Sequence, residues 1–335
     1  MEWYVLLFVA LAAVVAAVLL FTLAPAIIID RAVFGSRQDK REKFKYFTPE
    51  EFSLNTEVIP VSYCGVNLYA NIYTVKPVEE CGAVVIFAHG FGAGTSSYMT
   101  EIAHFAKCGF AVVAADAYGC NNSAGKKIKG FYAGAEAVIA AYIAVKSEKR
   151  LKDKKVVLVG HSWGAYSVAA ACGKVKADGV VAISGFNAPA QCLCDQLKHM
   201  GALGKTYAPL LHGWFWLFNI FKFGACGNTK AVNAVKKSGT KALAIHGEKD
   251  KTVPLKHSFA KLAEGVGAQV VMLADKRHNP YNTVAAEARL ASLTGAHNFA
   301  NGEEEKAYFA SFDWQAVTEE DAEVMAAIDR FIANA

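Results

Sequence analysis

The sequence predicts an α/β protein in which a mostly parallel central sheet is covered by helices on both faces. Three observations support this prediction. Short, almost wholly apolar runs of strand-forming residues alternate with segments of helical periodicity, a pattern typical of parallel sheets that are buried on both sides. With 335 residues, 54% of them hydrophobic, the chain can bury a full core. A serine between two glycines separates one of the strands from the helix that follows it.

The N-terminal segment differs from the rest of the chain. Residues 3–29 contain no charged side chain, and about 20 apolar residues are enough to cross a bilayer. We therefore expect residues 1–30 to form a transmembrane anchor. A cleaved signal peptide is the alternative, because Ala24-Pro25-Ala26 resembles a cleavage site. A retained anchor is favoured because the chain starts with Met-Glu, without a basic region, and because the apolar stretch is longer than a signal peptide needs.

Basic residues concentrate directly after this segment, in a region that we predict to be a basic juxtamembrane linker, residues 31–55. They are Arg31, Arg37, Lys40, Arg41, Lys43 and Lys45. The positive-inside rule then predicts a single-pass membrane protein whose catalytic domain is cytoplasmic. Eight cysteines, mostly in apolar contexts, agree with a reducing compartment. The net charge of +5 is spread among intermixed acids and bases, so we expect no nucleic-acid partner.

The strands and helices are expected in one domain, residues 56–335. A hairpin around Cys64-Gly65 opens it, with strands over residues 57–63 and 67–75. The expected core strands cover residues 83–88, 110–115, 155–159, 179–184, 241–245 and 269–273, and the expected helices cover 98–107, 133–148, 165–174 and 257–265. Right-handed crossovers bring the carboxyl ends of such strands to one edge, where we expect the active groups.

The stretch VVLVGHSWGAYS places Ser162 between the strand 155–159 and the next helix. A serine on such a sharp turn has a strained backbone that exposes its hydroxyl. Glycines two residues on either side, Gly160 and Gly164, fit a turn in which backbones pass too close for a side chain. The helix N-terminus that follows favours negative charge near Ser162. This pattern predicts a nucleophile.

Three further stretches supply the groups that a serine nucleophile needs. Asp250 follows the strand 241–245, and His278 follows the strand 269–273. A serine hydroxyl requires an imidazole to take its proton and an acid to fix the imidazole tautomer. The loop after the strand 83–88 can direct the backbone N–H of Phe91, together with that of Trp163, at a developing oxyanion.

Other residues compete for these roles. Glu248 and Asp275 are the alternatives to Asp250, which is favoured by its place after a strand. Three more histidines adjoin the expected strands, and we interpret them as structural. They are His89, His161 and His246. We expect Asp116 to brace the turn at residues 117–119.

From residue 56 to 335 the chain resembles the α/β-hydrolase family, in its serine-hydrolase branch. Serine aminopeptidases, monoacylglycerol lipases and lysophospholipases are the most similar group. The resemblance implies an α/β-hydrolase fold with an inserted cap. It also implies Ser162 as nucleophile, Asp250 as acid and His278 as base, with the backbone N–H groups of Phe91 and Trp163 as the oxyanion hole. The chain departs from many relatives at Ala165, where they have glycine, and at Trp163, where they have methionine or glycine.

The cap is expected at residues 185–238, because that segment fits no strand-helix unit and the family inserts a cap at this point. Its aromatic-rich part, residues 207–223, is short for a second span and is interrupted by His212, Asn219 and Lys222. Two interpretations remain open. The cap helices either pack on the core, or form a lid that lines an acyl pocket and contacts the bilayer.

These observations predict a membrane-anchored serine hydrolase that cleaves an acyl ester, preferably a lipophilic one. An acyltransferase or a peptidase with the same three residues is one alternative, and a catalytically silent, membrane-tethered binding module is another. We expect no cofactor. We also expect no metal, since Cys192-Leu193-Cys194 lacks a histidine or cysteine pair at the usual zinc spacing.

Overall fold

A computed structural model describes residues 2–92, 94–295 and 297–335. Within these residues, eight strands form one sheet in the order β1-β2-β4-β3-β5-β6-β7-β8. The sheet begins with the expected hairpin of β1 (Asn55–Tyr63) and β2 (Val66–Thr74). Cys64 and Gly65 connect these strands with φ values of 50° and 76°. Two consecutive left-handed residues match the twist of a tight hairpin turn.

The other six strands run parallel to one another. Their bounds are β3 (Val84–Ala88), β4 (Ala111–Ala115), β5 (Val156–His161), β6 (Gly179–Ile183), β7 (Lys241–Gly247) and β8 (Gln269–Leu273). The strands β3 to β6 are buried throughout, whereas β8 at the edge is partly exposed. The near-continuous apolar runs in the sequence therefore correspond to strands that are covered on both faces.

Two helical layers cover the sheet. One face packs against α2 (Met99–Lys107) and α11 (Ala322–Asn334). The other face packs against α3 (Tyr132–Ser147), α4 (Trp163–Ala171) and α7 (Ala231–Ser238). Alternate residues of one strand point into different layers, as Val85 and Ile86 of β3 do. The fold class predicted from the sequence is confirmed.

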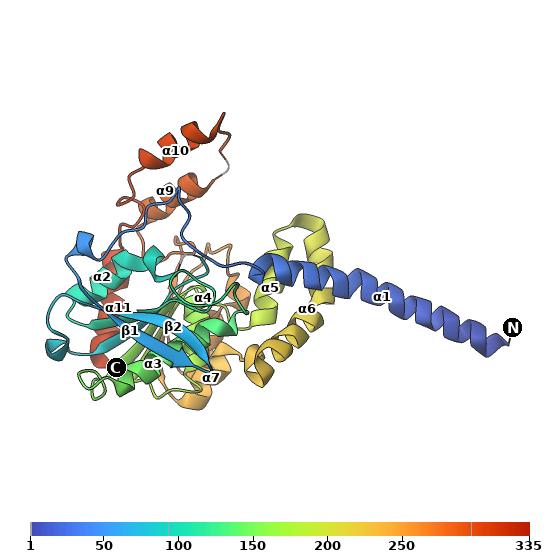
Figure 1. Cartoon of the computed structure of the whole chain (residues 1–335), viewed down its shortest axis with the longest axis horizontal. Coiled ribbons are helices and arrows are strands. Elements are labelled where there is room, and N and C mark those ends of the chain that lie inside the picture. Colours follow the sequence, from blue (N-terminus) through green and yellow to red (C-terminus); the bar gives the residue numbers. More distant parts are fainter. Residues whose placement is uncertain (1, 93, 296) are drawn as a thin grey trace.

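The C-terminal half shows one difference from the prediction. Instead of one helix over residues 257–265, the structure has a short α8 (Phe259–Ala263) between two single 3-10 turns. Gly265 lies in the second turn, and Gly267 ends it with a φ of 77°, a conformation that stops a helix. Beyond β8, α9 (Val284–Thr294) and α10 (Gly302–Ala310) lie apart from the sheet (Figure 1).

The segment for which we predict a cap contains α5 (Pro189–Lys198) and α6 (Gly201–Phe223), followed by α7. Helices α5 and α6 pack on each other, and α7 packs on α4. Figure 1 shows α5 and α6 beside the sheet, on the side from which the N-terminal helix extends.

That N-terminal helix, α1 (Trp3–Phe34), is 32 residues long and is the one helix of the described chain that is long and apolar enough to cross a membrane. Its side chains are exposed from residue 3 to residue 21. The last third packs against α6, where Trp214 Nε1 donates to Thr22 Oγ1 at 3.0 Å and Lys222 Nζ lies 2.5 Å from Asp30 Oδ1. After α1 the chain runs along the domain, with a β-bridge between Gln38 and Cys120.

Candidate active site

Ser162 sits on a strained turn between β5 and α4. Its φ of 56° and ψ of −115° lie in a region that side chains with a Cβ rarely adopt. A Cβ on Gly160 would lie 2.4 Å from the carbonyl oxygen of Gly164, and one on Gly164 would lie 1.9 Å from that of Ala88. Both glycines are therefore required by close backbone contacts, as the sequence analysis expects.

The three predicted side chains converge at the carboxyl ends of β5, β7 and β8. His278 Nε2 lies 2.9 Å from Ser162 Oγ, and His278 Nδ1 lies 2.8 Å from Asp250 Oδ2. Nδ1–H donates to the carboxylate, so Nε2 can accept the serine O–H. The alternative acids, Glu248 and Asp275, are both exposed, whereas Asp250 is the carboxylate in contact with the ring.

Asp250 is held as a carboxylate. Its side chain is buried, and its second oxygen, Oδ1, accepts the backbone N–H groups of Thr252 and Val253 at 2.8 Å and 3.0 Å. Burial acts to raise the pKa of Asp250. The hydrogen bond and charge of His278, together with the N–H of Val253, outweigh burial and hold this pKa below its ordinary value. A carboxylate fixed in this way orients the imidazole.

A second histidine supports the first. His161 Nε2–H donates to the backbone oxygen of His278 at 2.8 Å, and the hydroxyl of Tyr98 lies 2.9 Å from His161 Nδ1. Burial lowers the pKa of His161 to about 3, with the nearby charge of His278 as a further cause. The ring is therefore neutral, with one nitrogen donating and the other accepting. A structural role for His161 is expected from the sequence, whereas no sequence pattern indicates Tyr98.

Three further buried polar side chains near the site contact backbone atoms. His89 Nε2 accepts the N–H of Ala117 at 3.0 Å, and His246 Nε2 lies 3.1 Å from the oxygen of Val253. Asp116 accepts the N–H of Thr95 at 2.7 Å and that of Asn122 at 3.1 Å. The contacts of His89 and Asp116 join the loops after β3 and β4, and the contact of His246 holds the loop after β7 against the end of that strand.

The two predicted oxyanion donors lie on adjoining segments. Trp163 is the first residue of α4, and Phe91 is in the loop after β3. Their rings are 5.5 Å apart. The indole of Trp163 is buried and its Nε1 donates to the oxygen of Phe131 at 2.6 Å. The bulky ring is thus fixed beneath α3, and the donor role of both N–H groups stays a prediction.

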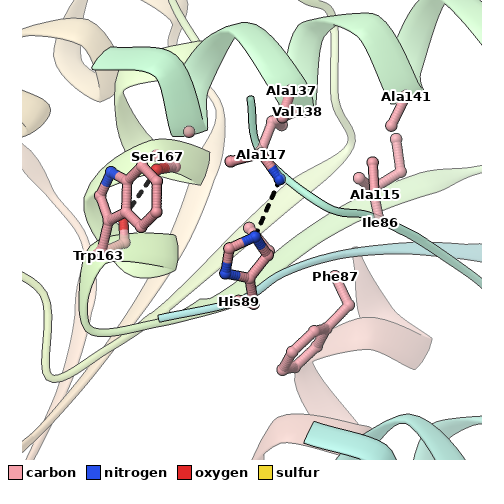
Figure 2. Close-up of a pocket in the computed structure, with 12 residues that line it drawn as sticks. Ile86, Phe87, His89, Ala115, Ala117, Ala137, Val138, Ala141, Trp163 and Ser167 are labelled. Carbon is pink, nitrogen blue, oxygen red and sulfur yellow. Dashed lines mark hydrogen bonds between the residues drawn. The ribbon is translucent and has the colours of Figure 1, made fainter. Parts of the chain in front are cut away.

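The space beside Trp163 is too small for a substrate. Figure 2 shows a cavity between Trp163 and Ser167 of α4 and Ala137 of α3, with His89 below it. Its volume is about 10 Å³, which is about the minimum for one water molecule. A larger cavity of about 740 Å³ adjoins Asp250 and His278 and is lined mainly by polar and charged residues.

Aromatic rings connect the end of α1 with the turn at Ser162, which we call the nucleophile turn after its predicted role. These rings form the aromatic cluster: Phe34, Phe91, Phe131, Trp163 and Phe186. Phe34 lies 5.0 Å from Phe131 and 6.3 Å from Phe91, both centroid to centroid. Phe131 lies 5.0 Å from Phe186. Phe34, Phe131 and Phe186 could not be predicted from the sequence, because they come from three segments that no local pattern relates.

One group of side chains has the composition of a metal site. His104 of α2, Cys108 directly after α2, and Asp329 of α11 offer ligand atoms within 4.8 Å of one another. However, His104 Nδ1 lies 2.8 Å from Glu320 and its Nε2 lies 3.0 Å from Asp329. The imidazolium and two carboxylates already account for this group as an ion-paired contact between α2 and α11.

Comparisons with known proteins agree with this architecture. A family model described as alpha/beta hydrolase fold matches residues 83–215. An esterase of Pyrococcus furiosus is similar in structure, with a TM-score of 0.57, 17% identity, and 82% of this chain and 96% of that chain covered. The α/β-hydrolase GrgF from Penicillium sp. sh18 has a TM-score of 0.52 at 16% identity, covering 77% of this chain and 100% of its own.

An acylaminoacyl peptidase has a TM-score of 0.51 at 13% identity, with 75% of this chain and 44% of that chain covered. No curated protein matches the sequence. The expected resemblance is confirmed: this chain has the α/β-hydrolase fold. The catalytic roles of Ser162, Asp250, His278, Phe91 and Trp163 stay predictions.

Proposed function

From the α/β-hydrolase fold of this chain, we propose that it is a membrane-anchored serine hydrolase that cleaves carboxylic acyl esters. One observation carries the proposal. On the strained turn after β5, Ser162 Oγ, the ring of His278 and the carboxylate of Asp250 form a continuous hydrogen-bonded series at 2.9 Å and 2.8 Å. This is the arrangement that activates a serine for acyl transfer.

In the proposed reaction, His278 Nε2 takes the proton of Ser162 as Oγ attacks the ester carbonyl. The oxyanion of the tetrahedral intermediate accepts hydrogen bonds from the backbone N–H groups of Phe91 and Trp163. Loss of one such donor typically costs about 3 kcal/mol of barrier stabilisation. His278 then gives its proton to the leaving alcohol, and the acyl group stays on Ser162. Water, deprotonated by His278, releases the acid and restores the serine.

Anchoring by α1 is also a proposal, and two features support it. The exposed apolar part of α1 has the length of a membrane span. The helix continues through Ala24-Pro25-Ala26, and Ala26 is fully buried against the folded domain. The helix thus contacts the folded domain on both sides of the possible cleavage site, through Thr22 before it and Asp30 after it. These contacts favour an uncleaved helix. The basic residues after α1 support a cytoplasmic catalytic domain.

A lipophilic ester is the preferred substrate in this proposal, because the aromatic cluster adjoins both the nucleophile turn and the end of α1. An acyltransferase or a peptidase would use the same three side chains. Analysis of products from esters, aminoacyl amides and competing alcohols separates the three activities. A silent binding module would turn over none of these substrates.

The test uses the full chain in detergent or lipid nanodiscs. A fluorophosphonate probe should label the wild type, and Ser162→Ala should abolish the labelling. Ser167→Ala is the matched control, since Ser167 lies on α4, the helix that begins directly after Ser162, and its hydroxyl donates to the oxygen of Trp163 at 2.8 Å. Labelling that persists in Ser162→Ala would refute the nucleophile. A panel of nitrophenyl esters, monoacylglycerols and lysophospholipids then defines the substrate.

A further inference from the structure

Helix α6 has two apolar faces, and the protein covers only one of them completely. The inner face is buried on the domain and consists of Gly204, Ala208, Leu211, Phe215 and Asn219. Most amphipathic helices of globular proteins have a polar face opposite such a surface. Helix α6 does not follow this rule.

The second face is a row of residues at alternating spacings of three and four, and we call it the outer stripe: Met200, Leu203, Tyr207, Leu210, Trp214, Leu217 and Phe221. This spacing places the six residues from Leu203 to Phe221 on one side of the helix, and Met200 directly precedes it. The row contains no charge. Leu203 and Phe221 are 76% and 78% exposed. Met200 and Leu210 are also exposed, whereas the other three are half-buried. Exposed apolar side chains in such a row indicate an interaction site.

Helix α1 covers only part of the outer stripe, and its own exposed surface indicates the surroundings of the rest. Thr22 of α1 accepts a hydrogen bond from Trp214 of the stripe, and Asp30 of α1 forms an ion pair with Lys222, next to the stripe. The 19 residues of α1 before Thr22 are themselves exposed and apolar, and at 1.5 Å per residue they span about 28 Å, close to the thickness of a bilayer core. In the proposed anchoring, the bilayer that surrounds this part of α1 therefore begins near Thr22, the residue that contacts Trp214.

The charges near the end of α6 fit the same environment. Lys222 forms an ion pair with Asp30, and its Nζ lies 4.7 Å from the ring centroid of Phe34. Lys129 Nζ lies 4.6 Å from the ring of Phe223, and the adjoining Lys126 and Lys127 are exposed. Lysines beside an apolar helix face are suited to the anionic headgroup region of a membrane.

We propose that the outer stripe of α6 lies in the interfacial layer of the bilayer that α1 spans. This inference rests on the proposed membrane anchor. It makes α6 an interfacial helix beside a transmembrane one, so the domain faces the bilayer with the side that carries α6. The aromatic cluster begins at Phe34, at the end of α1, and reaches Trp163 beside the nucleophile. An acyl chain that leaves the bilayer thus meets apolar side chains on its way to Ser162.

The first experiment measures lipid contact in the full chain, independently of activity. A cysteine replaces Leu203 or Phe221 and is labelled with the environment-sensitive fluorophore NBD. The labelled protein is then reconstituted in vesicles of phosphatidylcholine with 30 mol% phosphatidylserine. Cys64 and Cys108, which are exposed, are changed to serine in this background. Lys205→Cys is the matched control, because Lys205 is exposed on the same turn but outside the stripe.

Labels at 203 and 221 should be blue-shifted and quenched by brominated lipids at least threefold more than the label at 205. Equal quenching at all three positions would overturn the proposal. A second result would also overturn it: no quenching by brominated lipids at 203 and 221, together with energy transfer between labels that increases with the density of protein in the vesicles. That result would assign the stripe to a second copy of the chain.

A second experiment connects the surface to turnover. Leu203→Ser/Phe221→Ser should lower hydrolysis of a long-chain monoacylglycerol in the same vesicles at least fivefold, while hydrolysis of a water-soluble acetate ester stays within twofold. An equal loss on both esters, or no loss on either, would contradict the inference. If the wild type hydrolyses neither ester, the proposed hydrolase function fails, and the NBD experiment still decides the position of α6.

Discussion

Two histidines of this protein have both ring nitrogens engaged in nearly the same way. His278, after β8, lies between the carboxylate of Asp250 and the hydroxyl of Ser162, at 2.8 Å and 2.9 Å. His104, on α2, lies between the carboxylates of Glu320 and Asp329, at 2.8 Å and 3.0 Å. The distances to the two partners are alike, but the second partner is a hydroxyl at His278 and a carboxylate at His104.

That one difference separates the proposed proton acceptor, His278, from a structural cation, His104. Burial alone would lower the pKa of His104, but hydrogen bonds to Asp329 and Glu320 and their charges raise it to about 10. Both nitrogens of His104 are then protonated at neutral pH, and neither can accept a proton. His278 has a hydroxyl as its second partner, so its neutral form keeps a lone pair directed at Ser162. A contact between histidine and carboxylate therefore does not identify a catalytic base by itself.

The largest expected effect tests the difference between His278 and His104 directly. His278→Ala should reduce kcat/KM for an activated ester by about 10⁵-fold or more, since no other group takes the serine proton. His104→Ala should leave kcat/KM within about threefold at neutral pH, because surface ion pairs act on stability and not on the reaction. Steady-state kinetics on the full chain measure both. A large loss in His104→Ala with an unchanged fold would contradict the distinction.

The next effect concerns the acid. Asp250→Asn should lower kcat by about 10⁴-fold, because an amide allows the wrong imidazole tautomer toward Ser162. Circular dichroism should show an unchanged fold, and the rate of fluorophosphonate labelling should fall in parallel with kcat. Glu248→Gln is the control, since that carboxylate is exposed. A fall of less than tenfold in Asp250→Asn would transfer the role to another acid.

A smaller effect follows from the pKa of His104. Its folded-state pKa of about 10 exceeds the unfolded value of about 6.5, so its stabilising contribution is complete below about pH 6.5 and disappears as the pH rises through about 10. The wild type should therefore lose about 2 kcal/mol of unfolding free energy over this window, a figure reduced for partial solvent exposure.

His104→Gln should lack this pH-dependent difference, while the exposed His199→Gln should retain it. Urea unfolding of both variants and the wild type at pH 6.5, 8.5 and 10 measures the effect, and the difference between variants removes the contribution of other groups that titrate near pH 10. If the unfolding free energy of His104→Gln depends on pH in the same way as that of the wild type, the ion pairs of His104 do not stabilise the contact between α2 and α11.

The smallest expected effect sharpens the description of His278. Tyr98→Phe removes the hydroxyl that contacts His161 Nδ1, and His161 in turn holds the backbone of His278. A neutral hydrogen bond is worth about 1 kcal/mol, so kcat should fall about fivefold with KM unchanged. Tyr142→Phe is the control, since its hydroxyl bonds to the oxygen of Lys176, a residue outside the site. A change confined to KM would contradict a positioning role.

Local patterns account for what the sequence could predict. The strands and the turn at Ser162 follow from short apolar runs and from two glycines, and Asp250 and His278 follow from their places after strands. Contacts between distant segments are different. His104 and Asp329 are 225 residues apart, and Tyr98 and His161 are 63 apart, so no spacing relates them. The outer stripe has a helical period, but the inner face of α6 is equally apolar, and periodicity cannot distinguish the two.

Helix α1 continues without interruption from Trp3 to Phe34, and its last residue is buried in the core of the domain. In the membrane anchoring that we propose, this continuous helix fixes the orientation of the domain as well as its position, because no flexible linker separates the two. We expect an enzyme mounted in this way to work within its own leaflet. Its rate would then follow the mole fraction of substrate among the lipids and not the amount of substrate per volume of solution.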